Sequence, residues 1–268
     1  MIPKVIHYCW FGRNPKPRSV KKCIKSWKKY CPGYEIIEWN EDNYDVSRNL
    51  YMKQAYDAKK WGFVPDFTRL DIICRYGGIY LDTDVELIKS IDGLLDDDFF
   101  CGFELNSRGA MVALGLGFGA VKEHPLVKKL LSMYDTLQFI GQDGALNLTP
   151  SPDYTSQILT TCGFVLENVT QRIGRDVVYA SDVLSPLFFP TGEITITENT
   201  LSIHHYDASW FSKEKQRDKR KRWRKLRRIR FIQKIIGEEK TNAVRKKYHR
   251  IRAKLKRRYV SVCKRKNR

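Results

Sequence analysis

Apolar and polar positions in the first third of the chain follow two alternating periodicities. Runs rich in β-branched and aromatic residues, typical of strands, occur at "KVIHYCWFG" (4–12) and "YEIIEW" (34–39). Between them, apolar residues recur one helical turn apart over 17–33, where a proline near the start and a Pro-Gly pair at the end favour a helix. Two more helical patterns follow, over 47–61 and 66–76. The chain therefore alternates strands with helices.

A third strand, "IYLDTD" (79–84), completes the order that is typical of a parallel α/β sheet. Gly77 and Gly78 precede it, and such a pair suits a helix end that turns sharply through positive φ. In parallel sheets, ligands bind beyond the carboxyl ends of the strands. Asp82 and Asp84 lie at such an end and are therefore candidate site residues.

The two aspartates predict a divalent cation. Residues i and i+2 of a strand point to the same side, so Asp82 and Asp84 are expected to present two carboxylates together. Such a pair repels unless a cation is bound, and oxygen ligands favour Mg²⁺ or Mn²⁺, which commonly serve a diphosphate. With 18 aspartates in 268 residues, about one Asp-x-Asp is expected by chance, and Asp96–Asp98 is a second instance. A solvated loop is thus the alternative for the triplet alone.

Charge divides the chain into two parts. Residues 213–268 hold 27 lysines and arginines against 4 acids, whereas residues 1–212 hold 22 against 26. This predicts a mildly acidic globular domain over 1–212 and a basic tail over 213–268.

No apolar run reaches the length of a membrane span, and no signal peptide is expected. Seven scattered cysteines without CxxC spacing favour neither disulfides nor zinc. A cytoplasmic protein is expected.

The segment around the aspartates resembles a known family. "FVPDFTRLDIICRYGGIYLDTDVEL" (63–87) is similar to the central signature of glycosyltransferase family 32, which includes capsular and surface-polysaccharide enzymes and yeast Golgi mannosyltransferases, and whose core is related to that of the glucosylating clostridial toxins. "IPKVIHYCWFG", "SWKKYCPGYEIIEWNEDN" and "SIHHYDASW" resemble the family's start, second strand and end. The resemblance implies a GT-A, Rossmann-like α/β fold with a mostly parallel sheet, and a basic helical C-terminal extension lies outside the family's core.

The resemblance also implies a donor site. Trp10 matches the aromatic residue on which the donor's uracil stacks, with a core tryptophan as the alternative. Asp66 and Arg69 match a pair that contacts ribose, donor sugar and phosphate, and a surface ion pair at i, i+3 is the alternative. Tyr80 matches a donor-contacting tyrosine and is equally compatible with a core position. Pro65 before Asp66 departs from the family's usual serine or alanine and suggests that the helix begins there.

The resemblance implies the metal ligands as well. Asp84 matches the direct ligand, and Asp82 matches the partner that holds the ribose and the metal's water. His204 is the predicted third ligand, and His205 is the second choice. With Arg69, the two aspartates are the predicted catalytic residues.

The implied reaction is transfer of a hexose from a nucleotide sugar, expected to be a UDP-sugar, to a glycan in polysaccharide or capsule biosynthesis, with retention. The metal, Mn²⁺ or Mg²⁺, and Arg69 would stabilise the leaving nucleoside diphosphate. No nucleophile for double displacement is evident, so front-face attack is expected. Ser209 and Trp210 match residues that close on the metal and the β-phosphate, and Glu104 and Asn106 are candidates for the acceptor side.

The basic tail suggests a surface partner. Its segment 213–237 mixes lysine and arginine with an apolar stripe, a pattern typical of helices that lie on anionic lipid. Nucleic-acid binding and a disordered solubilising tail are the alternatives, the first being disfavoured. The expected partners are thus a nucleotide sugar, a glycan acceptor that can be lipid-linked, and the cytoplasmic face of an anionic membrane. The rival function is a non-enzymatic membrane- or nucleic-acid-binding protein, against which the acidic balance of residues 1–212 argues.

Overall fold

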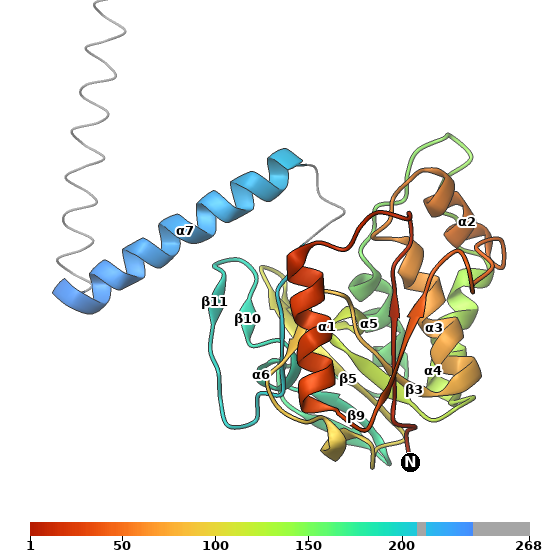
Figure 1. Cartoon of the computed structure of the whole chain (residues 1–268), viewed down its shortest axis with the longest axis horizontal. Helices are drawn as coiled ribbons and strands as arrows, with labels where there is room; N and C mark the ends of the chain where they lie inside the picture. Colours follow the sequence, from red (N-terminus) through yellow and green to blue (C-terminus); the bar gives the residue numbers. More distant parts are fainter. Residues whose placement is uncertain (208–212, 238–268) are drawn as a thin grey trace, which may run out of the picture. The chain divides into compact units, whose positions relative to one another are not determined.

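The computed structural model describes residues 1–207 and 213–237, and the chain divides into two compact units, Met1–Gln216 and Arg217–Arg268. The first unit is built on an eight-stranded sheet of order β2-β1-β3-β7-β5-β9-β8, with β6 paired to β5 (Figure 1). Its strands are β1 (Val5–Cys9), β2 (Glu35–Trp39), β3 (Gly78–Tyr80), β5 (Phe99–Asn106), β6 (Gly109–Ala113), β7 (Phe118–Ala120), β8 (Gln171–Ile173) and β9 (Asp176–Tyr179). The functional boundary expected between residues 212 and 213 stays a prediction.

The central sheet is mostly parallel. β1 pairs in parallel with β2 and β3, and β5 pairs in parallel with β9. β7 runs antiparallel between β3 and β5, so that five of the eight strands point the same way. The expected α/β fold with a mostly parallel central sheet is confirmed.

Helices cover both faces of this sheet. Figure 1 shows α3 and α4 on one side, separated from α1 by β1 and β3. Alternate residues of β5 point to opposite faces: Phe99, Cys101 and Phe103 pack in one apolar core with the helices α2 to α5, and Phe100 packs in the other with α1 and α6. The helices are α1 (Arg18–Tyr30), α2 (Leu50–Asp57), α3 (Val64–Tyr76), α4 (Pro125–Ser132), α5 (Ser151–Thr161) and α6 (Ser181–Leu184).

Short elements complete the first unit. β4 (Val85–Leu87) pairs with β12 (Ser202–His204), and β10 (Leu187–Phe188) pairs with β11 (Glu193–Ile194). Three single-turn helices are η1 (Asp92–Leu94), η2 (Leu114–Leu116) and η3 (Met133–Asp135). The β4–β12 pair lies outside the central sheet and carries one edge of the candidate site.

The helix and glycine predictions around the site are confirmed, but the strand prediction over 79–84 is wrong in its extent. Gly77 and Gly78 end α3 with φ of 67° and 99°. β3 ends at Tyr80, and the chain then turns, with the Val85 N–H donating to the Asp82 carbonyl at 3.0 Å. Asp82 and Asp84 therefore lie in a turn, a setting that aspartate favours, and not at alternating positions of a strand.

The second unit contains most of helix α7 (Lys213–Ile236). The predicted basic helical extension is thereby confirmed over Lys213–Ile236, and its residues 238–268 lie outside the described part of the chain. Phe231 and Ile235 on it are 66% and 65% exposed. Within the described residues, no helix combines the length and the apolar content needed to span a bilayer.

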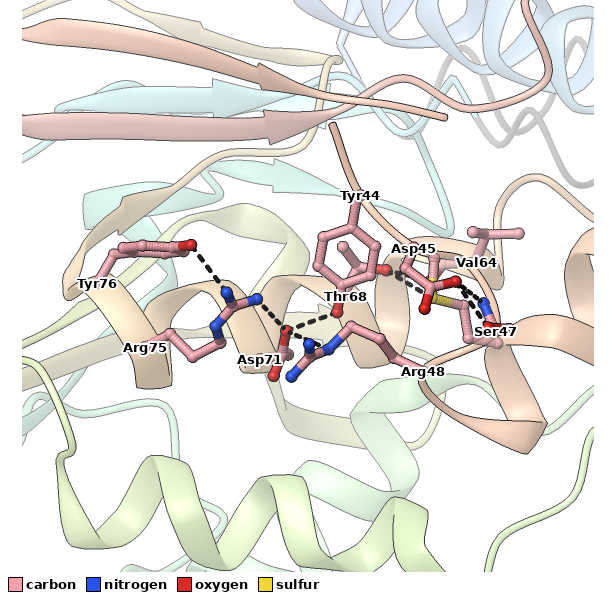
Figure 2. Close-up of polar contacts among 10 residues, drawn as sticks. Tyr44, Asp45, Ser47, Arg48, Val64, Thr68, Asp71, Arg75 and Tyr76 are labelled. Carbon is pink, nitrogen blue, oxygen red and sulfur yellow. Dashed lines mark hydrogen bonds and ion pairs between the residues drawn. The ribbon is translucent and has the colours of Figure 1, made fainter. Parts of the chain in front are cut away.

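A buried carboxylate joins the loop before α2 to helix α3 (Figure 2). The Asp71 Oδ2 atom accepts a hydrogen bond from the Tyr44 hydroxyl at 2.6 Å and lies 3.4 Å from Arg48 Nε and 3.3 Å from Arg75 Nη1. Asp71 is 5% exposed, and burial raises the pKa of Tyr44, with the bond to Asp71 acting in the same direction. This contact fixes α3, which also carries Asp66 and Arg69, against the preceding loop.

We expect Asp71→Ala to destabilise the protein by about 1 to 3 kcal/mol, because it leaves the buried Tyr44 hydroxyl without its acceptor. Asp57→Ala is the matched control, since Asp57 pairs with Lys53 at side-chain exposures of 54% and 45% and such exposed pairs contribute about 0 to 1 kcal/mol. Urea unfolding of the two variants measures the difference. Equal losses of unfolding free energy would contradict the structural role of Asp71.

Candidate active site

The pairing of β4 with β12 brings the end of the first unit to the aspartates. In this antiparallel pair, His204 lies opposite Val85. The turn that contains Asp82 and Asp84 leads directly into β4, and His204 is the last residue of β12. The aspartates and the histidine therefore meet through strand pairing.

Asp82, Asp84 and His204 form a cluster, called here the carboxylate–histidine cluster, whose ligand atoms lie within 4.8 Å of one another. His204 Nε2 lies 3.0 Å from Asp84 Oδ1. The other ring nitrogen, Nδ1, is buried and has no hydrogen-bond partner among the residues described. Two carboxylates and an imidazole with a buried, unpartnered nitrogen fit a divalent cation such as Mn²⁺. The fold thus brings the predicted ligand set together, and its metal binding remains a prediction.

Asp84 also holds the chain after β12. Its side-chain Oδ2 accepts a hydrogen bond from the Asp207 N–H at 2.8 Å, and its carbonyl accepts one from the His205 N–H at 3.0 Å. The His205 ring points elsewhere, with Nε2 2.8 Å from Glu86 Oε2. Of the two candidate histidines, the structure therefore places His204, and not His205, beside the aspartates.

Burial and charge act in opposite directions on the pKa values of the cluster. Burial alone raises the pKa of Asp84, but the charge and hydrogen bond of His204 and the Asp207 N–H lower it to about 2. Burial raises the pKa of Asp82 against the opposing charge of Arg69. Burial lowers the pKa of His204, yet Asp84 and Asp82 raise it overall. When His204 is protonated it balances part of the acidic charge, and a bound cation would replace that proton.

Arg69 and Asp66 form a buried ion pair on helix α3. Arg69 Nη2 lies 2.7 Å from Asp66 Oδ1, and Nη1 lies 3.8 Å from Asp82 Oδ2. Their side chains are 5% and 6% exposed, so the alternative of a surface ion pair is wrong. Burial raises the pKa of Asp66 to about 6 despite the opposing charge of Arg69. Arg69 is the cation that links this pair to the carboxylate–histidine cluster.

Tyr80 supports that arginine. Its side chain is 1% exposed, and its ring centroid lies 5.3 Å from Arg69 Cζ and 6.0 Å from the ring of Phe118. Contact with a cation over the ring face is stabilising. Tyr80 is therefore packed in the core and also touches the site, which combines the two interpretations that the sequence left open.

Trp10 lies just beyond the end of β1 and is half-buried. Its Nε1 donates to the Asn14 carbonyl at 2.7 Å, and Lys16 Nζ lies 5.8 Å from the ring centroid. One part of the indole packs against the core around α1. It is not a fully enclosed core tryptophan, and its stacking role stays a prediction.

Gly115 is a site residue that sequence reasoning missed. It lies in η2, and a Cβ added to it would approach Asp82 Oδ2 to 2.4 Å and Arg69 Nη1 to 3.2 Å. Any side chain larger than hydrogen would displace the Asp82 carboxylate or Arg69. The repeated glycines of "ALGLGFG" (113–119) were the available signal, but they do not reveal which residue they face.

Glu104 and Tyr206 lie beside His204. The Tyr206 hydroxyl donates to Glu104 Oε2 at 3.2 Å, and Asn106 Nδ2 lies 3.4 Å from Glu104 Oε1. The Tyr206 ring packs edge-on against His204, with centroids 4.1 Å apart. Burial raises the pKa of Glu104, while the charge of His204 opposes that rise. The predicted acceptor-side residues Glu104 and Asn106 are therefore beside the cluster, and Tyr206 joins them.

Ser209 and Trp210, predicted to close over the metal and the β-phosphate, lie outside the described residues 1–207 and 213–237. The segment that leads to them is held by Asp84 through the Asp207 N–H. Their roles stay predictions.

Comparison with known families finds a match in the segment that carries these residues. Residues 17–100 match the family model described as a glycosyltransferase sugar-binding region containing a DXD motif. This range includes Asp66, Arg69, Tyr80, Asp82 and Asp84.

Individual proteins with similar sequences include two named transferases. Inositol phosphoceramide mannosyltransferase 1 of Schizosaccharomyces pombe is 27% identical over 137 residues, which are 47% of this chain and 40% of that protein. The mimivirus protein "Uncharacterized glycosyltransferase L373" (Acanthamoeba polyphaga mimivirus) is 28% identical over 56% of this chain and 61% of its own. The chain therefore spans less than two thirds of either relative. Among solved structures, PaToxG glycosyltransferase aligns with a TM-score of 0.45 and 20% identity, over 60% of this chain and 69% of that one.

We expect Asp84→Asn to abolish Mn²⁺ binding, because it removes one of two carboxylates while the amide oxygen can still accept the Asp207 N–H. Asp96→Asn is the control, since Asp96 belongs to the exposed second Asp-x-Asp instance and lies outside the cluster. Titration with Mn²⁺ followed by electron paramagnetic resonance measures both. Equal affinity in Asp84→Asn and the parent would show that the cluster is not the metal site.

A second variant tests the close approach of η2. Gly115→Ala is expected to weaken Mn²⁺ binding by roughly tenfold, since overpacking against Asp82 costs about 1 to 3 kcal/mol. Gly33→Ala is the matched control, because nothing lies within 4 Å of a Cβ added there. The same titration, with thermal unfolding to check the fold, separates the two. Unchanged Mn²⁺ affinity in a folded Gly115→Ala protein would exclude the positioning role.

Proposed function

We propose that this chain, which belongs to the DXD-containing glycosyltransferases of the family 32 type, transfers a hexose from a nucleotide sugar to a glycan with retention of the anomeric configuration. The observation that carries the proposal is the half-buried carboxylate–histidine cluster of Asp82, Asp84 and His204, which lies beside the buried Arg69–Asp66 pair. Acidic ligands for a divalent cation next to a buried guanidinium suit a nucleoside diphosphate. Glycosyltransferases with this motif typically use a divalent metal, and Mn²⁺ or Mg²⁺ is proposed here.

The metal ligands and Arg69 would both stabilise the leaving nucleoside diphosphate. Asp84, Asp82 and His204 would hold the metal ion, which when bound neutralises charge on the diphosphate oxygens. Arg69 lies between Asp66 and Asp82 and presents a permanently charged, planar donor to the phosphate or the donor sugar. Because Arg69 and Asp66 are nearly fully buried, their charges act in a medium that screens them weakly. Leaving-group stabilisation therefore falls to groups that the fold has already oriented.

The proposed transfer step is a front-face displacement. The bond between the anomeric carbon and the diphosphate oxygen breaks, and a bond to the acceptor hydroxyl oxygen forms on the same face. The proton of that hydroxyl passes to the departing phosphate oxygen. Such a step needs no protein nucleophile, and it needs an acceptor side that holds the hydroxyl near the donor.

The donor and the acceptor contact different residues around the cluster in this proposal. Trp10 stacks on the donor base, which is proposed to be uracil, and Asp66 and Tyr80 contact ribose and sugar or position Arg69. Glu104, fixed by the Tyr206 hydroxyl, faces the acceptor. The raised pKa of Glu104 suits a carboxyl that binds a sugar hydroxyl without competing for the metal.

The acceptor is proposed to be a glycan in surface-polysaccharide or capsule biosynthesis that can be carried on a lipid. The name of the S. pombe relative couples mannosyl transfer with inositol phosphoceramide, a lipid, which supports a lipid-linked acceptor here. The basic helix α7 with its exposed Phe231 and Ile235 supports peripheral attachment to the cytoplasmic face of an anionic membrane. The non-enzymatic alternative leaves the cluster without a role.

Thermal unfolding with UDP, GDP and CMP sugars, each with and without Mn²⁺, tests the proposal. We expect UDP sugars with Mn²⁺ to raise Tm and to be turned over. The anomeric configuration of the product, read by NMR, should match that of the donor.

Trp10→Ala should raise the donor KM about tenfold and Trp10→Phe much less, because base stacking contributes about 1 to 3 kcal/mol. Full turnover in EDTA would exclude the metal, and equal KM values would exclude stacking on Trp10.

A further inference from the structure

Helix α1 carries a row of exposed cations on one face. Its 13 residues include six lysines and arginines and no acid. All six are exposed, whereas Val20, Cys23 and Trp27 are buried against the sheet. The six cations, called here the α1 cationic face, are Arg18, Lys21, Lys22, Lys25, Lys28 and Lys29.

The spacing of these residues makes the face narrow and straight. At 100° per residue they fall within about a third of the helix circumference, opposite the buried residues. At 1.5 Å per residue the helix is about 20 Å long. A row of this kind can bring all six charges to one plane at once.

Most of this charge is not neutralised within the protein. Among the residues that the structure describes, Arg18, Lys21, Lys25 and Lys28 form no ion pair. Lys22 pairs with Glu86 at 2.8 Å, and Lys29 lies over the Tyr30 ring. The other residues of 1–212 hold 16 lysines and arginines against 26 acids. Apart from α1, residues 1–212 therefore carry a net negative charge.

We propose that the α1 cationic face docks the catalytic body on the surface of an anionic lipid bilayer. A planar anionic surface is complementary to a flat row of cations and repels the acidic remainder of the body, so that only one orientation is favoured. Single-stranded nucleic acid is a poorer fit, because Trp27, the tryptophan of α1, is fully buried and offers no surface for base stacking. Each cation near the bilayer strengthens binding about fivefold.

The inner face of α1 is attached to the strand that follows Asp84. Trp27 Nε1 donates to the Val85 carbonyl at 2.8 Å, and the Leu87 N–H donates to Ser26 Oγ at 2.9 Å. Docking through the outer face would thus fix the orientation of the carboxylate–histidine cluster relative to the lipid. This surface is distinct from the basic tail, and it does not depend on the transfer reaction.

Lysine footprinting of the full chain bound to vesicles tests the contact directly. On phosphatidylserine-containing vesicles, acetylation of Lys21, Lys25 and Lys28 should fall at least fivefold, while Lys59 and Lys122, near α2 and α4 on the other face of the sheet, should stay reactive. Pure phosphatidylcholine vesicles should protect neither set. Because the tail alone can bind vesicles, unprotected α1 lysines on a vesicle-bound chain would overturn the proposal.

Two triple variants with equal net charge give the energetic test. K21Q/K25Q/K28Q should weaken vesicle binding by about two orders of magnitude at low salt, at about fivefold per charge. K59Q/K122Q/K129Q should change it by less than threefold, and raising the salt should shrink the difference between the triples. Equal vesicle affinities of the two triples would overturn the proposal. So would a gel shift with single-stranded DNA in which the α1 triple loses more affinity than it loses for vesicles at the same salt.

Discussion

The partial burial of the Asp84 carboxylate, whose side chain is 16% exposed, is the constraint on which the candidate site depends. Removing a carboxylate from water is costly unless charge and hydrogen bonds compensate it. Here the compensation comes from the His204 ring and the Asp207 N–H, which lies 123 residues further along the chain. Because these partners are supplied by β12 and the segment after it, the end of the first unit must close against the turn after β3. The same closure assembles the candidate cation ligands and brings Tyr206 and Glu104 beside them.

Helix α3 distributes a second set of buried charges over two of its sides. Asp66 and Arg69 belong to the site, and Asp71, two residues later, is held by Tyr44, Arg48 and Arg75. A helix buried to this extent would ordinarily be apolar, so each of these charges requires a partner. The charges make the helix a rigid carrier that is anchored on one side and functional on the other. Rigid support of this kind is what a preorganised electrostatic site requires.

Outside the site, exposed cations extend along whole helices. The half-buried cluster is acidic and suits a cation, whereas exposed cations are concentrated on α1 and on α7. The partly buried acidic groups are screened less by salt than the exposed cations, which act only on surfaces within about a Debye length of roughly 8 to 10 Å. The two kinds of charge are therefore kept on different parts of the chain.

The sequence by itself determined the α/β order, the glycine-ended helix α3 and the basic helix α7, because periodicity and turn chemistry are local properties. The Asp-x-Asp spacing singled out Asp82 and Asp84, whereas Asp66, Arg69 and His204 were implied by the resemblance to family 32. It misjudged the strand before the aspartates, since an apolar run does not show where hydrogen bonding to β1 stops. Only the tertiary structure decided between His204 and His205, through the register of β12 on β4. It alone revealed Gly115 against Asp82, because a close approach between segments depends on how the chain packs in three dimensions.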